Sequence, residues 1–154
     1  MIIDKEVENV LRESGWDERR RLDKEAILDQ LSTEGYPVLE NVVEALQNFN
    51  GLVIYFNNKR NGLRDDINFD FSHAIHLEVP ERVFKNYVPR IGKKLILIGS
   101  AYRDHFVLLM AEDNSIYGGY DNYLCKIGSN PINAIENIIL DKNFTEIPPL
   151  PQPS

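Results

Sequence analysis

The chain has 154 residues, a net charge of −7 and 43% hydrophobic residues, a composition typical of one folded domain with a core of its own. Its single cysteine, Cys125, excludes an internal disulfide and a metal site built from several cysteines. Residues 1–50 carry most of the excess negative charge, which disfavours a nucleic-acid binder and fits either a basic partner or a solvated helix surface.

The first residues predict a cytoplasmic protein. "MIIDKEVENV" places acids where a secretory signal would have basic residues followed by an apolar stretch. The sequence also has no apolar run near the roughly 20 residues of a membrane span.

Three helices are predicted in the N-terminal third, because apolar residues recur there at i, i+3 and i+4. The first runs from Asp4, an N-cap residue, to about Ser14 and ends at Gly15. The second begins near Asp23 and stops at Gly35, and the third extends from about Pro37 to Asn48, with Gly51 past its end.

The pattern then becomes extended. Residues 52–56, "LVIYF", predict a strand, and the polar segment 57–66 predicts a turn or mobile loop. "INFDFS", residues 67–72, alternates in polarity and predicts a half-buried strand. A short helix follows from Pro80, closed by Pro89 and Gly92.

The rest of the chain predicts an antiparallel meander and a closing helix. Residues 94–102, 105–113 and 115–120 are three strands joined by short polar turns, and residues 122–127 are a possible fourth. "LILIG" and "FVLLMA" are apolar on both faces and should be central strands covered by helices. Asn130 caps the last helix and Pro131 begins it.

The predicted fold is therefore α+β: N-terminal helices, a mostly antiparallel sheet of about five to six strands, a closing C-terminal helix and a single core. We expect residues 1–142 to form one domain. The proline-rich residues 143–154 are expected to be extended or disordered.

The chemistry-bearing side chains do not assemble into a recognisable motif. His73 and His76, with Asp70, are either a metal cluster or surface histidines; a strand would place the two histidines on opposite faces, and HExxH and CxxC are absent. Cys125 lies in an apolar strand and reads as a buried thiol. His105, at a hairpin turn, could approach a carboxylate. We assign no catalytic, cofactor-binding or metal-binding residue, and no cofactor.

Two further motifs have plain structural readings. "YGGY", residues 117–120, lacks the spacing of a phosphate-binding loop and indicates a bend or bulge. "PPLPQP" is either a polyproline ligand or a frayed terminus.

"SGWDERRRLD", after a short helix, resembles the Gly-Trp…Arg start of the third subfamily of the SUKH superfamily of bacterial immunity proteins. "FNGLVIYF" is similar to the family's helix-to-strand Gly-Leu step, and "INFDF" to its extended aromatic segment. The chain from "IGKKLILIG" to "NAIENII" resembles its closing strand, hairpin, Gly-marked strand and helix. The resemblance covers roughly residues 5 to 142.

The family's arginine corresponds to Arg20, although Arg19 or Arg21 could take its place, because the Pro-Gly that often precedes it is Glu18-Arg19 here. A structural role fits this motif of Gly15, Trp16, Arg20 and Gly51. Gly15 can end the helix in a left-handed conformation, Trp16 can bury its ring between helix and sheet, and Arg20 can anchor the turn through a forked bond to a carboxylate.

The resemblance implies an immunity protein, without catalytic activity, that binds and neutralises a cognate toxin domain, often a nuclease. An acidic protein suits a basic nuclease groove. The partner-binding candidates are loop acids and tyrosines of the sheet, each of which could equally be an ordinary turn residue: Asp65, Asp66, Tyr102, Asp104, Glu112, Asp113, Tyr120, Asp121 and Tyr123. The alternatives are a general protein-interaction or regulatory module of the same fold, and a small metal-dependent hydrolase using His73, His76 and Asp70.

Overall fold

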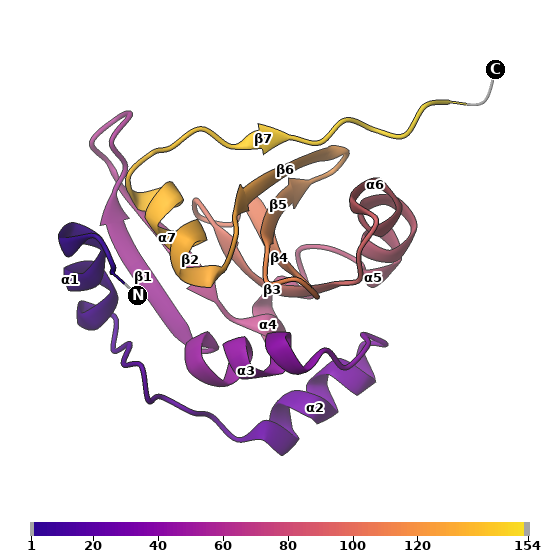
Figure 1. Cartoon of the computed structure of the whole chain (residues 1–154), viewed down its shortest axis with the longest axis horizontal. Coiled ribbons are helices and arrows are strands. Elements are labelled where there is room, and N and C mark those ends of the chain that lie inside the picture. Colours follow the sequence, from indigo (N-terminus) through magenta and orange to yellow (C-terminus); the bar gives the residue numbers. More distant parts are fainter. Residues whose placement is uncertain (1, 153–154) are drawn as a thin grey trace.

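The computed structural model describes residues 2–152, so residues 153 and 154 of the predicted tail lie outside the described chain. Seven antiparallel strands form one open sheet in the order β1 to β7, with helices packed around it (Figure 1). The α+β class and the meander are confirmed. The strand count exceeds the five to six predicted, because the tail contributes the short strand β7.

The three N-terminal helices are present: α1 (Lys5–Glu13), α2 (Lys24–Thr33) and α3 (Glu40–Phe49). Asp4 caps α1 as predicted, since its carboxylate accepts hydrogen bonds from the amides of Glu6 and Val7. Gly15 follows α1 with a φ of 98°, a conformation open to glycine at little cost. α3 starts later than the predicted Pro37, at Glu40.

The strands run in chain order across the sheet: β1 (Leu52–Asn57), β2 (Arg64–Phe69), β3 (Leu95–Ala101), β4 (Phe106–Ala111), β5 (Ile116–Tyr120), β6 (Tyr123–Gly128) and β7 (Thr145–Glu146). β3 and β4 are interior strands and nearly all of their residues are buried, as predicted. β2 begins within the segment predicted to be a loop, because Arg64, Asp65 and Asp66 pair with the end of β1.

One prediction for this region was wrong. The strand expected over residues 67–72 ends at Phe69, and Phe71–Ala74 form the short helix α4. Asp70 causes the change, since its carboxylate accepts a hydrogen bond from the amide of His73 and caps α4. The predicted short helix then appears as α5 (Pro80–Arg82), a π-helical turn η1 (Val83–Tyr87) and α6 (Val88–Ile91). Pro89 lies inside α6 rather than closing it.

Helices cover both faces of the sheet. α7 (Pro131–Ile139), capped by Asn130 as predicted, lies on one face, with Ile135 and Ile138 against Leu108 and Ile116. On the other face, Tyr87 of η1 lies so close to Gly119 that an added Cβ would approach its ring to 2.9 Å. Within residues 2–152, no helix is long and apolar enough to cross a membrane.

Candidate protein-binding surface

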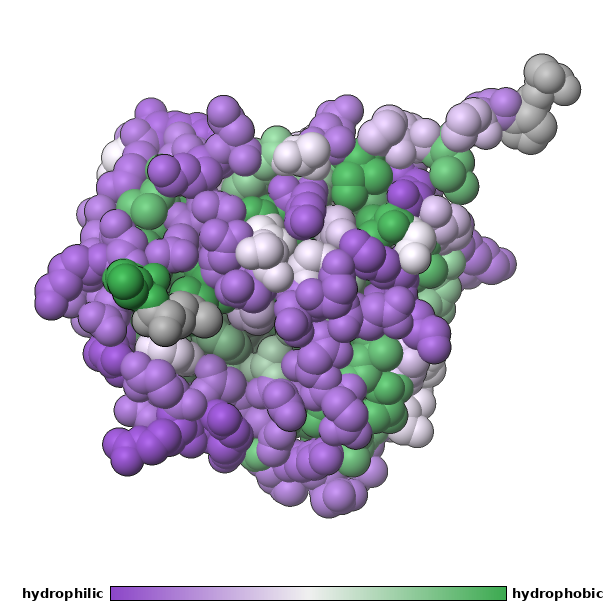
Figure 2. Space-filling view, viewed as in Figure 1, coloured by the Kyte–Doolittle hydropathy of each residue, from purple (hydrophilic) through white to green (hydrophobic). Residues whose placement is uncertain are grey.

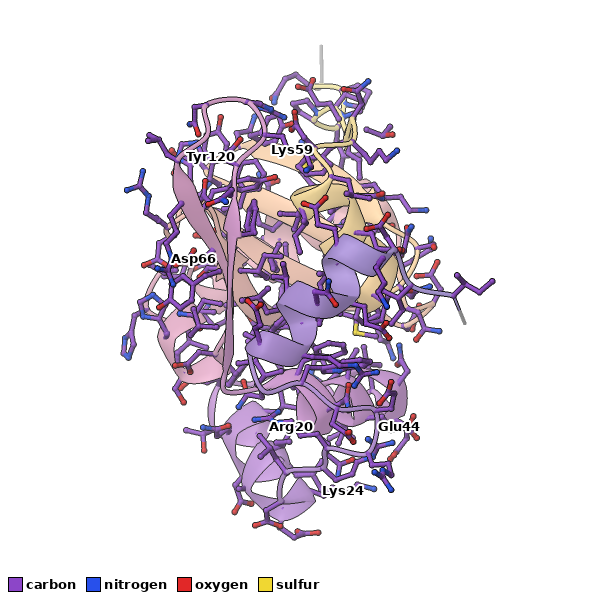
Figure 3. The ribbon with its side chains drawn as sticks, turned by 90° about the vertical axis from the view of Figure 1, so that its left-hand side faces the viewer. Arg20, Lys24, Glu44, Lys59, Asp66 and Tyr120 are labelled. Atoms are coloured by element: carbon purple, nitrogen blue, oxygen red, sulfur yellow. The ribbon has the colours of Figure 1, made fainter. Side chains whose placement is uncertain are left out.

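The meander gathers three turns at one end of the molecule. Successive strands reverse direction, so the β1–β2, β3–β4 and β5–β6 turns share one end of the sheet, here called the hairpin end. The β4–β5 turn lies at the opposite end. Figure 3 shows Lys59 and Tyr120 toward the hairpin end, with Lys24 and Glu44 of the N-terminal helices far from them.

Three aromatic rings form a cluster at the hairpin end, here called the aromatic platform: Phe106, Tyr120 and Tyr123. Phe106 begins β4, and Tyr120 pairs with Tyr123 across the β5–β6 turn. Phe106 and Tyr120 have centroids 5.6 Å apart and planes 13° from parallel, and Tyr120 and Tyr123 have centroids 5.1 Å apart at 27°. Gly118 leaves room for this cluster, since a Cβ there would lie 3.1 Å from the ring of Phe106.

The platform forms one side of an open hollow of about 470 Å³, lined by Asn58, Arg60, Asp65, Tyr102, His105, Phe106, Tyr120, Tyr123 and Phe144. Four of the candidates from the sequence line this hollow: Asp65, Tyr102, Tyr120 and Tyr123. Sequence reasoning did not select Asn58, Arg60, Phe106 or Phe144. Phe106 carried a usable signal, because it shares a face with Leu108 and Met110 but stands at the end of its strand.

Ion pairs fix the walls of the hollow. Arg60 Nε lies 2.7 Å from Asp141 Oδ1, which joins the β1–β2 turn to the segment after α7. Lys59 Nζ lies 2.9 Å from Glu6 Oε2 on α1. Asp65 Oδ2 accepts a hydrogen bond of 3.2 Å from Asn58 Nδ2. The charge of Arg60 is therefore balanced by Asp141, whereas the side-chain partner of the Asp65 carboxylate is the uncharged amide of Asn58.

The phenols beside the hollow keep their protons at neutral pH. Burial raises the pKa of Tyr123 to about 12 and raises the pKa of Tyr102 well above its ordinary value. Both groups can therefore donate a hydrogen bond to a partner while presenting an uncharged ring.

The other acids of this end shape the turns. Asp66 Oδ1 accepts from the amide of Arg103 at 2.9 Å, and Asp104 accepts from Ser100 Oγ at 2.8 Å while lying 2.8 Å from His73 Nε2. Tyr102, Arg103 and Asp104 all have positive φ, of 56°, 52° and 67°. Three consecutive left-handed residues without glycine are costly, and such strain concentrates at functional loops. Asp121 also has a positive φ, 49°, and its carbonyl accepts from Tyr87 Oη.

Glu112 and Asp113 are not part of this surface. They lie in the β4–β5 turn at the opposite end, where Asp113 Oδ2 is 2.8 Å from Lys93 Nζ and Asp113 Oδ1 accepts from the amide of Ser115. Hydrogen bonds from Lys93 and Ser115 hold the pKa of Asp113 far below its ordinary value. The contacts of Asp113 are those of a turn residue.

The Gly-Trp…Arg segment ties α1 to the end of α3. Trp16 is 6% exposed, its ring is nearly parallel to Phe49 at 6.2 Å, and its indole nitrogen donates to Asn48 Oδ1 at 2.8 Å. Arg20 makes a forked contact, but its acceptors are the carbonyls of Asn48 and Asn50, at 2.8 and 2.9 Å, and not the predicted carboxylate. Carbonyl groups from the last turn of α3 and from the residue that follows it thus take the place of the predicted carboxylate.

Gly51 completes this arrangement: its φ is 92°, and a Cβ added there would lie 3.4 Å from Arg20 Nη2. Arg19 instead pairs with Asp17, and Arg21 donates to the carbonyls of Glu18 and Arg20. Among the three arginines, Arg20 is thus the one that bridges to the sheet side.

The histidine and cysteine candidates are separated. Asp70 caps α4, His73 contacts Asp104, and His76 follows α4 in a turn. Within the described residues, no three His, Cys, Asp or Glu side chains come together to hold a metal ion. His105, which was expected to approach a carboxylate, instead packs on Phe106 and Tyr120. The histidine that contacts a carboxylate is His73, whose partner is Asp104. Cys125 is buried, and burial raises its pKa to about 11.

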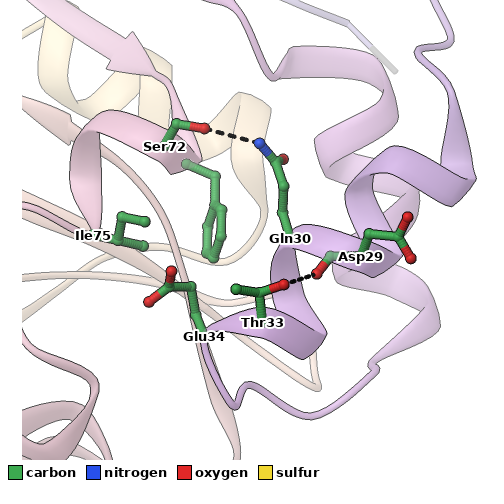
Figure 4. Close-up of a pocket in the computed structure, with 7 residues that line it drawn as sticks. Asp29, Gln30, Thr33, Glu34, Ser72 and Ile75 are labelled. Atoms are coloured by element: carbon green, nitrogen blue, oxygen red, sulfur yellow. Dashed lines mark hydrogen bonds between the residues drawn. The ribbon is translucent and has the colours of Figure 1, made fainter.

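A second hollow, of about 280 Å³, lies between α2 and α4 (Figure 4). Gln30 Nε2 donates to Ser72 Oγ at 2.8 Å across it, and Asp29 and Glu34 lie on its α2 side. It contains no candidate from the sequence, and its polar contact joins the two helices.

Comparison with known families identifies the chain over nearly all of its length. The model of the SUKH-3 immunity protein family matches residues 3–141, in agreement with the SUKH resemblance of the sequence. Comparisons with curated proteins and with solved structures give no match. The chain belongs to the SUKH-3 immunity protein family.

Proposed function

We propose that the protein neutralises a cognate toxin domain by binding it in a stoichiometric complex, without catalytic turnover, and that the toxin is a basic nuclease. Membership of the SUKH-3 immunity protein family over residues 3–141 carries this proposal. An immunity protein protects by occupying its toxin, so its function lies in a surface and not in a reaction.

The hairpin end is the surface that we propose for the contact. It brings three turns, the exposed ring of Tyr120 and the partly buried ring of Tyr123 to one place, with loop acids around them. Aromatic side chains at the centre of a contact and polar groups at its rim are the usual arrangement of a protein interface. A standard interface buries about 1,600 Å² in total, more than the hollow alone offers, so the contact would extend over the neighbouring turns.

The charge of the protein supports a basic partner. The net charge is −7, and the face seen in Figure 2 is mostly hydrophilic, with hydrophobic side chains in smaller areas. Opposite net charges accelerate association and select against acidic competitors. The nucleic-acid groove of a nuclease is a surface of the required sign.

Co-expression tests the proposal. A toxin-like reading frame beside the gene is expressed alone and together with this protein, and growth is scored. We expect growth to be rescued and the two chains to co-purify in fixed ratio, with nuclease activity suppressed in the complex. Growth arrest that persists despite abundant folded protein would contradict a protective role. Rescue with a partner that lacks nuclease activity would refute the nuclease assignment alone.

A further inference from the structure

We propose that the hollow at the hairpin end receives an arginine side chain of the toxin, stacked on the aromatic platform and paired with Asp65. This inference rests on the proposed function, and it names the anchor of the contact. Three observations carry it: the aromatic rings that line the hollow, the charge of the lining, and the arginine–ring contacts found elsewhere in this protein.

The rings of the platform line an open hollow, where His105 packs against Phe106 and Tyr120. Phe106, Tyr120 and Tyr123 are within 30° of parallel to one another, with centroids 5.1 to 6.0 Å apart. Tyr120 is 41% exposed although it is a large aromatic residue of the sheet. A planar guanidinium stacks on such a surface through its face, and cation–π attraction adds to the contact.

The charge of the lining favours a cation. The lining holds one guanidinium, Arg60, one carboxylate, Asp65, and the imidazole of His105. Arg60 is paired at 2.7 Å with Asp141. Asp65 has no basic partner within 4.0 Å among residues 2–152; its two oxygens accept one hydrogen bond each, from Asn58 Nδ2 and from the amide of Asp66, which leaves lone pairs on both. A guanidinium on the platform could donate to that carboxylate in the forked geometry that arginine favours.

The protein already places arginines over aromatic rings elsewhere. The guanidinium of Arg64 lies 4.3 Å from the ring centroid of Tyr55, and that of Arg12 lies 5.3 Å from the ring centroid of Trp16. In the described part of the chain these are the two arginine–ring contacts, and neither involves the platform. Tyr120, 41% exposed beside the hollow, makes no such contact with an arginine of this chain.

A nucleobase is the competing occupant of a stacked aromatic surface. Single-stranded nucleic acid needs a cationic groove for its phosphates beside the rings. Here the lining offers one guanidinium, already neutralised, in a chain of net charge −7. The observations therefore favour a basic protein side chain.

The test uses matched small probes with the isolated protein. The peptide Ac-Gly-Arg-Gly-NH₂ and its neutral isostere with citrulline in place of arginine are titrated while backbone amide shifts are recorded by NMR. We expect saturable shifts at Tyr102, Phe106, Tyr120 and Tyr123 with the arginine peptide and affinity about tenfold weaker with the citrulline peptide. Equal affinities for the two peptides, or shifts at other positions only, would overturn the proposal, as would tighter binding of a thymidine oligonucleotide at the platform.

Three variants and a control make the result specific. Tyr120→Leu and Asp65→Asn should each weaken the arginine peptide by about tenfold, whereas Tyr120→Phe should retain most of the affinity because it keeps the ring. Tyr55→Leu is the matched control, since Tyr55 is 50% exposed on β1 and already covered by Arg64. Unchanged NMR spectra away from the substitution establish that each variant is folded.

Growth rescue separates this inference from the proposed function. If wild-type and Tyr120→Leu proteins rescue growth and bind the toxin equally well, the arginine anchor is wrong and the immunity function stands. If the wild type fails to rescue while the peptide results hold, the toxin assignment fails and the arginine-binding site stands as a site for another basic protein.

Discussion

Replacing Trp16 by alanine should remove the contact that joins the segment after α1 to the end of α3. The indole is 6% exposed, stacks on Phe49 and donates from its nitrogen to Asn48 Oδ1 at 2.8 Å. A tryptophan buries about 200 Å², and about 25 cal/mol per Å² gives an upper value near 5 kcal/mol. Measured core truncations of this size cost about 3–5 kcal/mol, so we expect a loss of about 4 kcal/mol in the free energy of unfolding.

In a chain of this length that loss should lower the thermal midpoint by about 10 °C. Far-UV circular dichroism is the appropriate readout, because the variant lacks the only tryptophan and with it the fluorescence signal. Trp16→Phe is the matched variant: it keeps a ring against Phe49 but loses the bond to Asn48, and should cost about 1–2 kcal/mol. An unchanged midpoint in Trp16→Ala would refute the assignment of Trp16 to the scaffold.

Four further predictions test the rest of the structure. Arg20→Lys should lower the free energy of unfolding, measured in urea, by about 1–2 kcal/mol, because one ammonium group cannot bond to the carbonyls of both Asn48 and Asn50 as the forked guanidinium does. Full retention of stability would contradict the anchoring role of Arg20. Gly119→Ala should lower the thermal midpoint, at a cost of about 1–3 kcal/mol, because its Cβ would lie 2.9 Å from the Tyr87 ring, and a neutral result would mean that η1 moves away freely. Cys125, with a pKa raised to about 11 by burial, should resist iodoacetamide at pH 8 in the native protein and react rapidly in urea, so fast native labelling would show that the strand is open. The folded-state pKa of Asp113 lies below its unfolded value near 3.8, so the ionised carboxylate stabilises the fold above that pH and this contribution is lost as the pH falls further. The free energies of unfolding of wild type and Asp113→Asn should therefore converge in acid. A constant difference between them would show that the ion pair of Asp113 with Lys93 is not the cause.

Local patterns in the sequence predicted most elements, because their causes are local. Asp4 and Asn130 cap helices through side-chain bonds to amides two or three residues ahead, and a reader of the sequence can see both. α4 was missed where two local signals conflict. The alternation of "INFDFS" continues through Phe71, but Asp70 turns the chain into a helix by capping His73. A side-chain bond of this kind prevails over alternation once the strand partner ends at Leu52.

The tail shows a different limit. β7 pairs with Cys125 and Lys126 of β6, so its formation depends on a free strand edge far from it in sequence. The prolines that follow Thr145 and Glu146 signal an extended chain but carry no information about that edge.

Topology explains why the candidate acids divide into two groups. Each of Asp65, Asp104, Asp113 and Asp121 lies in or beside a polar turn, and turn composition alone cannot distinguish them. In a meander, however, alternate turns lie at opposite ends, so the β4–β5 turn must face away from the other three. Counting strands from β1 would therefore have removed Glu112 and Asp113 from the candidates, once β1 and β2 were recognised as members of the same sheet.

The length of α7 accounts for the exposed aromatic platform. α7 starts after β6 has reached the end of the sheet opposite the hairpin end, and its nine residues rise about 13 Å. A six-residue strand such as β4 spans about 20 Å, so a helix of this length, even when laid along the strands, leaves roughly one third of the face uncovered. That third is the hairpin end, where Phe106, Tyr120 and Tyr123 replace the aliphatic residues found beneath the helix. The closing helix is therefore too short to cover the platform, and Tyr120 remains 41% exposed there.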